Sequence, residues 1–152
     1  MRRVGITEAR MGCWRWHRHL PPPIGALVAF AVEGPGRWPV GYALVGRPSS
    51  RVLQERGWVE LTRSATDGTP NATSALLGAA SRWARDKGSP IVTYTLEHES
   101  GASLRGAGWV CIGQVAPAQW TRTSRPRQLR SGVVAGGKLR WAPQWCADQW
   151  QG

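Results

Sequence analysis

The sequence predicts an α/β (α+β) protein, with a mixed, mostly antiparallel sheet and helices on both of its faces. Three strand-like segments follow one another at 25–33, 40–45 and 58–63, with only turns and a short loop between them. A clear helix at 71–87 then begins an alternation of helix and strand. Strands joined by tight turns pair antiparallel, and a strand reached through a helix pairs parallel, so this order builds a mixed sheet.

The start of the chain predicts one helix that is stopped by prolines. Thr7 stands at an N-cap position, and Glu8 adds a favourable negative charge to the first turn. The helical pattern continues to about Leu20, and the three prolines at 21–23 end it. The apolar segment 25–33 directly after them is expected to be the first strand.

Two further strands precede the long helix. The segment 40–45 is expected to form a hairpin with 25–33 around the turn sequence GPGRWP. The loop 46–56 has room for one helical turn. The segment 58–63 alternates, which places Trp58, Glu60 and Thr62 on one face and Val59 and Leu61 on the other.

The second half of the chain is predicted as helix, strand, helix and strand. The helix 71–87 has Gly88 at the position of a C-terminal cap. Its apolar residues recur at helical spacing: Ala72, Leu76, Ala79, Ala80 and Trp83. A strand at 90–96, a short helix at 100–107 that ends at Gly108, and a strand at 109–115 follow.

The last part of the chain differs in composition, because arginines there alternate with Ser, Pro and Gly. We expect residues 1–120 to form the main domain and 121–152 to form a basic extension packed on it. The segment 138–143 can add a last strand, and the end is expected to fray.

Composition limits the classes of function. The formal net charge is +11, which favours a polyanionic partner, nucleic acid or a phosphate-rich cofactor; an arginine-rich codon usage is the alternative. Ten tryptophans exceed what one core of 152 residues needs, so some are expected to stack on bases or rim a pocket. The three cysteines are widely spaced and form no disulfide framework or zinc motif. No apolar run suits a membrane span or a signal peptide, so a cytoplasmic protein is expected.

The loop before the helix 71–87 predicts an anion site. A strand feeds this helix through the small polar sequence TDGTPN, and free N–H groups and the positive end of the helix dipole point into the loop. The residues expected to hold a phosphate are Arg63, Thr66, Asp67, Gly68, Thr69, Asn71, Thr73 and Ser74. The alternative is that Asp67 or Asn71 only caps the helix.

TSALLGAASRWARDKG is expected to be a long helix after a small-residue loop, and EHESGASLRGAGW a short helix that runs into a Gly-aromatic pair. Over residues 25–115 these stretches resemble the GNAT family of N-acetyltransferases, in which such a long helix carries the coenzyme A pyrophosphate. More closely, HRHLPPP, GRPSSR and SRPR together with these stretches resemble small phage and mobile-element proteins related to phage proteins that modify adenine in DNA. The resemblance implies acetyl-CoA or a related acyl donor, and an amine of a nucleic-acid base, most simply in DNA, as acceptor.

The resemblance also implies catalytic residues. Glu60 in the third strand stands at the usual place of the GNAT general base; a structural pairing with Arg63 or Arg47 is the alternative. Leu104 stands where the family often has a tyrosine acid, so Ser103 or Tyr94 would substitute, or no side chain acts as acid. Asn71 and Thr73 occupy positions where the family's pyrophosphate loop has glycines.

Acceptor binding is assigned to residues outside the predicted phosphate loop. They are His17, His19, Arg47, Glu97, Glu99, Arg125 and Arg127. Cys13, His17 and His19 match no metal-ligand spacing, so no metal is expected. Two other functions stay open: an acetyltransferase acting on a small-molecule or protein amine, and a non-catalytic module that only binds nucleic acid.

Overall fold

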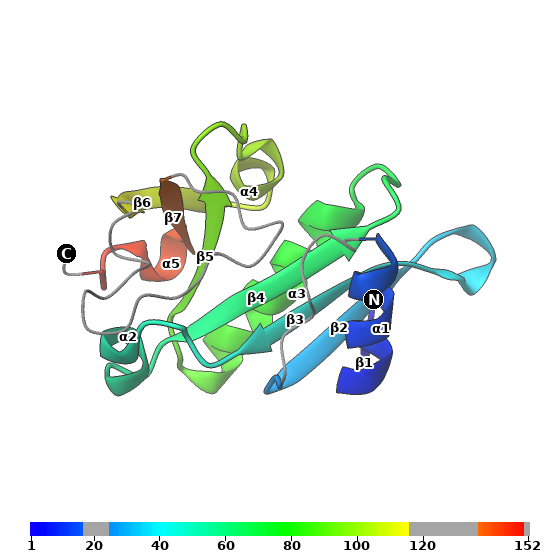
Figure 1. Cartoon of the computed structure of the whole chain (residues 1–152), viewed down its shortest axis with the longest axis horizontal. Helices are drawn as coiled ribbons and strands as arrows, with labels where there is room; N and C mark the ends of the chain where they lie inside the picture. Colours follow the sequence, from blue (N-terminus) through cyan, green and yellow to red (C-terminus); the bar gives the residue numbers. More distant parts are fainter. Residues whose placement is uncertain (17–24, 116–136, 151–152) are drawn as a thin grey trace, which may run out of the picture.

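The computed structural model describes residues 1–16, 25–115 and 137–150. The strands are β1 (Arg2–Val4), β2 (Val28–Glu33), β3 (Pro39–Gly46), β4 (Val59–Thr66), β5 (Ile91–Leu96), β6 (Trp109–Val115) and β7 (Lys138–Pro143). The helices are α1 (Ile6–Trp16), α2 (Arg51–Glu55), α3 (Ala72–Lys87), α4 (Ala102–Gly106) and α5 (Gln144–Ala147), with a 3-10 turn η1 (Pro35–Arg37). They surround one seven-stranded sheet of order β1-β2-β3-β4-β5-β7-β6 (Figure 1). The predicted mixed, mostly antiparallel sheet is confirmed.

The sheet opens between its two central strands. β4 and β5 are the parallel pair; their backbones pair through Val59 with Ile91 and Glu60 with Val92, and Thr93 Oγ1 donates to Leu61 O at 3.0 Å just beyond them. Beyond these pairs β4 stays with β3 as far as Thr66, whereas β5 turns to β7 (Figure 1). The two strands therefore diverge after Glu60, and their later backbone groups do not pair with each other.

Helices cover both faces of the sheet. α3 lies behind the sheet in Figure 1 and buries Leu76, Leu77 and Ala80 in the largest core cluster. α1 lies on the opposite face, where Ala9 and Cys13 pack with Tyr42 of β3. A third cluster lies beside α2 and α5 and contains Leu53, Trp58, Val92, Ala142 and Cys146. Apolar residues on alternate strand positions thus face two different helical layers.

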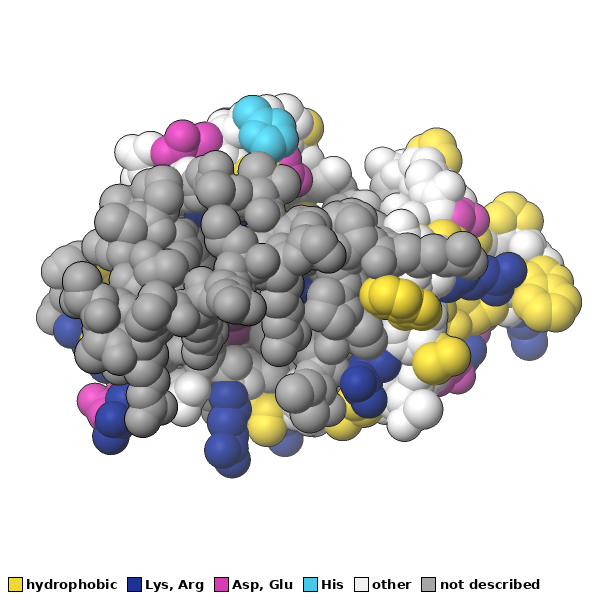
Figure 2. Space-filling view, in the orientation of Figure 1, with side chains coloured by type: hydrophobic (Ala, Val, Ile, Leu, Met, Phe, Trp, Pro, Cys, Tyr) yellow, Lys and Arg dark blue, Asp and Glu magenta, His cyan; other side chains and the backbone are white. Residues whose placement is uncertain are grey.

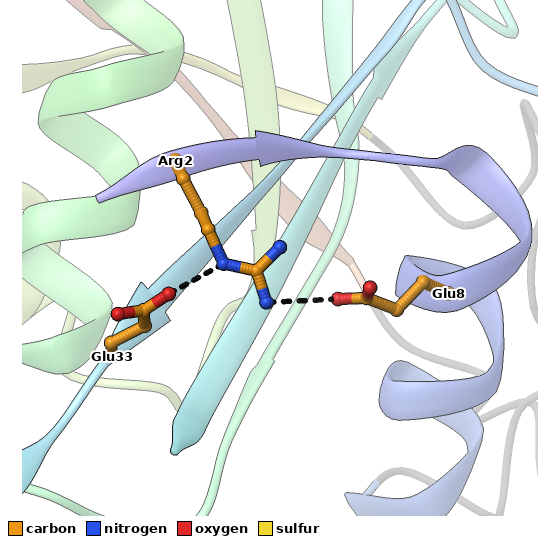
Figure 3. Close-up of polar contacts among 3 residues, drawn as sticks. All are labelled: Arg2, Glu8 and Glu33. Carbon is orange, nitrogen blue, oxygen red and sulfur yellow. Dashed lines mark hydrogen bonds and ion pairs between the residues drawn. The ribbon is translucent and has the colours of Figure 1, made fainter. Parts of the chain in front are cut away.

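One arginine of β1, Arg2, contacts both the adjacent strand β2 and the helix α1. Arg2 donates from Nε to Glu33 Oε1 on β2 at 2.5 Å, and its Nη2 lies 3.5 Å from Glu8 Oε2 on α1 (Figure 3). Its backbone pairs with Ala31. The side chains are partly exposed, so this pair of contacts orients the edge strand more than it stabilises the fold.

The elements of α3 and the β2–β3 hairpin agree with the sequence prediction. In the predicted apolar stripe Ala72, Leu76, Ala79 and Ala80 are buried, and Trp83 packs at its margin. Gly88 is the C-cap of α3 with φ 70°, a left-handed conformation that glycine adopts without strain. β2 and β3 pair antiparallel as predicted.

Two predictions on the elements are wrong, and one strand was missed. α1 begins at Ile6, so Thr7 lies inside the helix and is not its N-cap. The tail predicted to fray carries α5, because Cys146 is buried in the third core cluster and fixes that turn. The strand β1 was not predicted, since three residues are too few to give a periodic signal.

The predicted strand 138–143 is confirmed as β7, and it lies inside the sheet between β5 and β6. The predicted boundary between residues 120 and 121 falls outside the described residues and stays a prediction. Trp58, Trp109 and Trp141 belong to the core, whereas Trp14 and Trp38 are exposed. Hydrophobic side chains show at the end of the molecule that carries α1 and the β2–β3 hairpin (Figure 2).

Candidate functional site

A cavity of about 380 Å³ lies at the start of α3. Its wall comes from the end of β4, the β4–α3 loop, the first turn of α3 and the start of α4. The lining residues are Thr66, Gly68, Thr69, Pro70, Asn71, Thr73, Ser74, Ala102 and Ser103. None of these side chains is charged, and most carry a hydroxyl or amide, so the cavity offers hydrogen-bond donors without a competing carboxylate.

The loop around the cavity is held by its own short hydrogen bonds. Asp67 Oδ1 accepts from Thr69 N at 2.9 Å and from Thr69 Oγ1 at 2.5 Å, and these bonds lower the pKa of Asp67. Gly68 N donates to Thr66 Oγ1 at 3.3 Å. Asp67 therefore shapes the loop as an Asx turn and does not line the cavity.

The first turn of α3 is not capped by a side chain. Asn71 occupies the N-cap position in a left-handed conformation, φ 65°, and its side chain makes no capping bond. The alternative in which Asp67 or Asn71 satisfies the helix start is therefore wrong for the described residues. Ala72 N donates to Thr69 O at 3.2 Å, so the N–H groups of Thr73 and Ser74 are the ones that meet the wall of small residues together with the helix dipole, an arrangement typical of phosphate sites. The chemistry of this wall is suited to an anion.

Arg63 lies away from this cavity. It pairs with Leu44 in the sheet, on the face where Leu44 and Cys13 pack beneath α1. Burial lowers the pKa of Arg63, and the nearby Cys13 opposes that shift. The same burial raises the pKa of Cys13 to about 11. Of the eight predicted phosphate residues, Arg63 and Asp67 thus do not line the cavity, and the other six do.

Glu60 stands at the point where β4 and β5 part. It is half-buried, and its Oε1 accepts from Ser49 N at 3.3 Å and from Ser49 Oγ at 3.4 Å. Burial raises the pKa of Glu60, while the bonds from Ser49 and the charge of Lys138 oppose the rise. A carboxylate with a raised pKa beside an opening in the sheet is suited to general-base catalysis.

Tyr94 shares a face of the sheet with Glu60. Tyr94 OH accepts from Arg140 Nε at 3.4 Å, and the Arg140 guanidinium lies 4.0 Å from the ring centroid of Trp150. Burial raises the pKa of Tyr94, the bond and charge of Arg140 lower it, and Glu60 adds a smaller upward effect. Tyr94 therefore stays a protonated phenol whose oxygen is held in place.

The remaining predicted residues are spread over several places. Ser103 lines the α3 cavity, and its carbonyl accepts from Ser74 Oγ at 3.5 Å. Glu97 is exposed and accepts from Gln114 Nε2, and Glu99 accepts from Leu96 N at 2.8 Å in the turn after β5. Arg47 is exposed directly after β3. His17, His19, Arg125 and Arg127 lie outside the residues that the structure describes.

Sequence reasoning missed three residues around Glu60: Ser49, Lys138 and Arg140. The alternation of Lys138, Leu139 and Arg140 does predict that the two cations share a strand face. Nothing in the sequence predicts that this strand lies beside β5. In the described ranges no group of three His, Cys, Asp or Glu residues could hold a metal ion, and no helix there has the length and hydropathy to cross a membrane.

No protein-family model and no curated protein matches the sequence. Solved structures do match. An IAA acetyltransferase from Bacillus cereus superimposes with a TM-score of 0.61 and 13% identity, over 93% of this chain and 96% of that one. The ribosomal-protein-S18-alanine N-acetyltransferase from Escherichia coli gives 0.60 and 12%, over 93% and 90%. A GNAT family acetyltransferase from Elizabethkingia anophelis with acetyl-CoA bound gives 0.54 and 11%, over 76% and 74%.

The chain therefore has the fold of the GNAT acetyltransferases. At 11–13% identity the likeness establishes the fold alone. Some neighbours are longer: the chain spans 64% of nourseothricin acetyltransferase, with a TM-score of 0.54.

Proposed function

We propose that the chain is an N-acyltransferase that uses an acyl-CoA donor. One observation carries the proposal: β4 and β5 part after Glu60, with an uncapped helix start and its cavity at the open end and a half-buried carboxylate at the closed end. That arrangement supports the proposal, because an anion site and a base would then share the same opening of the sheet. The neighbour crystallised with acetyl-CoA supports this choice of donor.

The donor's pyrophosphate would lie at the start of α3. The N–H groups and hydroxyls of Thr73 and Ser74 would be the donors there, since the Thr69 hydroxyl already donates to Asp67, and Gly68 leaves room for close approach. An acyl-CoA supplies an activated thioester carbonyl. The protein's contribution is to bind its phosphates, to bring the acceptor amine to Glu60 and to move protons.

Glu60 would act as the general base. It takes a proton from the acceptor amine, and its raised pKa makes that transfer easier near neutral pH. Ser49 orients the carboxylate through two hydrogen bonds. Tyr94 is the better candidate than Ser103 for protonating the leaving thiolate, because it shares a sheet face with Glu60 while Ser103 lines the phosphate cavity.

For the acceptor we infer an exocyclic amine of a nucleic-acid base. The net charge of +11 favours binding to a polyanion, and several stretches resemble small phage and mobile-element proteins that are related to phage DNA-modification proteins. Described Lys and Arg side chains project along the lower edge and at the α1 end of the face in Figure 2. A small-molecule or protein amine is the second candidate, supported by neighbours named as acetyltransferases of other acceptors.

Expression with plasmid DNA tests the activity and the acceptor together. DNA is digested to nucleosides, and mass spectrometry searches for one with an added acyl group. The change Glu60→Gln keeps an oxygen that accepts from Ser49, so the fold is retained while the base is lost. We expect modification to fall about 10²–10⁴-fold. Glu55→Gln, which changes an exposed glutamate paired with Arg51 at 3.3 Å, is the matched control.

Two results would contradict parts of this proposal. Modification that survives intact in folded Glu60→Gln protein removes Glu60 as the base. Unmodified nucleosides, with coenzyme A bound in calorimetry, move the acceptor to a small-molecule or protein amine. Nucleic-acid binding without any affinity for coenzyme A would favour the non-catalytic module.

A further inference from the structure

The chain holds only two lysines, Lys87 and Lys138, although its formal charge is +11. Lys87 is exposed at the last residue of α3. Lys138 is half-buried at the first residue of β7. Almost every other cation is an arginine, which cannot serve as an acyl acceptor at neutral pH because its guanidinium stays protonated. Lys138, on a strand of the sheet, is therefore one of only two side chains of this chain that could accept an acyl group as a lysine amine.

Strand register puts Lys138 on the same face as Glu60. Alternation along β7 gives Lys138, Arg140 and Ala142 one face, and Ala142 packs with Val92 in the third core cluster. Val92 is the partner of Glu60 in the last β4–β5 pair. Lys138 pairs with Leu96, at the end of β5 that lies beyond the divergence. Lys138 thus lies on the same sheet face as Glu60, at the end where β4 and β5 have separated.

Among the described residues, charged and titratable groups of β4, β5, the turn after β5 and β7 lie around Lys138. Glu60 on β4 and Glu99 after β5 both attract its ammonium. Tyr94 on β5 and Arg140 on β7 face the same side, and Arg140 is held by Tyr94. Burial has the larger influence and lowers the pKa of Lys138, so a larger fraction of its amine is neutral than in an exposed lysine at the same pH.

We propose that Lys138 is a self-acylation site of this protein, with Glu60 as the base that deprotonates it. The inference rests on the proposed function. The ammonium gives one proton to the Glu60 carboxylate, and the neutral nitrogen attacks the thioester carbonyl of the bound donor. An amide C–N bond forms as the C–S bond breaks, and the second amine proton goes to the departing thiolate, which leaves as free coenzyme A.

Self-acylation would change the base that performs it. The amide is neutral, so the modified chain loses the cation that lowers the pKa of Glu60. A smaller fraction of Glu60 is then ionised at neutral pH. Acylation of Lys138 therefore lowers the capacity of the site to accept a further proton.

Incubation of the full chain with deuterated acetyl-CoA tests the inference. Peptide mass spectrometry assigns the label to Lys138, Lys87 or the Met1 α-amine, and calorimetry measures coenzyme A binding to the same samples. We expect one label at Lys138, at a first-order rate that does not depend on protein concentration. Lys87→Arg leaves this rate unchanged, Lys138→Arg abolishes the label, and Glu60→Gln slows it at least about 100-fold.

A second readout needs no coenzyme A. Trace acetic anhydride labels both lysines over a pH series, with Lys87 as the internal reference. Glu60→Gln removes an anion that attracts the Lys138 ammonium, so the labelling curve of Lys138 moves to lower pH relative to that of Lys87. This shift would show that the two side chains interact in solution.

The other possible results of these two experiments each contradict one part of the proposal. Bound coenzyme A with Lys138 unlabelled, or labelled no faster than Lys87, refutes self-acylation and leaves the proposed function standing. A rate proportional to protein concentration refutes the intramolecular step. An unshifted labelling curve refutes the Glu60–Lys138 interaction. Absence of coenzyme A binding refutes the proposed function, and the inference falls with it.

Discussion

Replacing Ser74 by aspartate should strengthen the fold and weaken the donor site at the same time. Ser74 is the third residue of α3, whose first turn has no side-chain cap. A carboxylate there interacts favourably with the helix dipole and should stabilise the protein by about 0.3–1 kcal/mol. The native side chain gives up little, since its hydroxyl makes one long bond to Ser103 O at 3.5 Å.

The same carboxylate would oppose a pyrophosphate in the cavity. Two unit charges about 4 Å apart repel by about 1 kcal/mol in water and by about 4 kcal/mol near a protein surface. Because the cavity opens to solvent, a value near 2 kcal/mol is appropriate, and it corresponds to roughly 30-fold weaker binding of coenzyme A. Added salt should narrow the difference, since it screens exposed charges.

Ser74→Asn is the matched control, because it removes the same hydroxyl and adds no charge. Calorimetric titration with coenzyme A gives the affinities, and urea denaturation gives the free energies of unfolding. We expect the aspartate variant to lose affinity for coenzyme A and gain stability, and the asparagine variant to change little in either quantity. If both variants bind coenzyme A as tightly as the native chain, the pyrophosphate does not lie at the start of α3. A fall in affinity that accompanies a fall in stability would indicate misfolding.

Two further predictions concern the base and the packing of α1. The acid limb of kcat/KM should lie at a higher pH than an ordinary carboxylate gives, because Glu60 must be ionised to act and burial raises its pKa. Ser49→Ala removes a hydrogen-bond donor to the Glu60 carboxylate and should move this limb to higher pH. A pH–rate series in which the limb moves to lower pH would contradict the assignment of Glu60 as the base. Gly12→Ala should destabilise the protein by about 1–3 kcal/mol in urea denaturation, because the added Cβ would come within 2.1 Å of Tyr42 Cδ2. Gly78→Ala is the control: its added Cβ meets only the flexible end of the Arg82 side chain, so this variant should be as stable as the native chain or more stable.

Patterns carried within one element could be predicted from the sequence. The apolar stripe of α3 and the cap at Gly88 are local, and both are present. The alternation of 58–63 correctly placed Trp58 and Glu60 on one face, since Trp58 packs in the cluster that contains Val92, the partner of Glu60. Six of the eight residues predicted for the phosphate loop line its cavity, because a loop that precedes a helix is also a local feature.

The position of Arg63 could not be predicted from strand alternation, because one extra residue in β4 changes the face on which Arg63 lies. Continued alternation from Leu61 would place Arg63 on the α3 face, near the helix start. The register between β3 and β4 instead shifts, so that Val45 pairs with Leu61 and Leu44 with Arg63. Such a bulge moves the following side chains to the other face, and Arg63 lies with Cys13 beneath α1. No residue type in the sequence marks the position of the bulge.

The surroundings of Glu60 depend on a contact that no local pattern contains. Lys138 and Arg140 come more than seventy residues later in the chain, and they reach the site only because β7 enters the sheet between β5 and β6. The sequence order would place β6 directly beside β5. Glu60, at the point where the strands separate, could thus be predicted from its strand, whereas the Lys138 charge that opposes the burial-raised pKa of Glu60 follows from topology. Variants of β7 are therefore expected to act on the proton chemistry at Glu60, and variants of the β4–α3 loop on the binding of the donor.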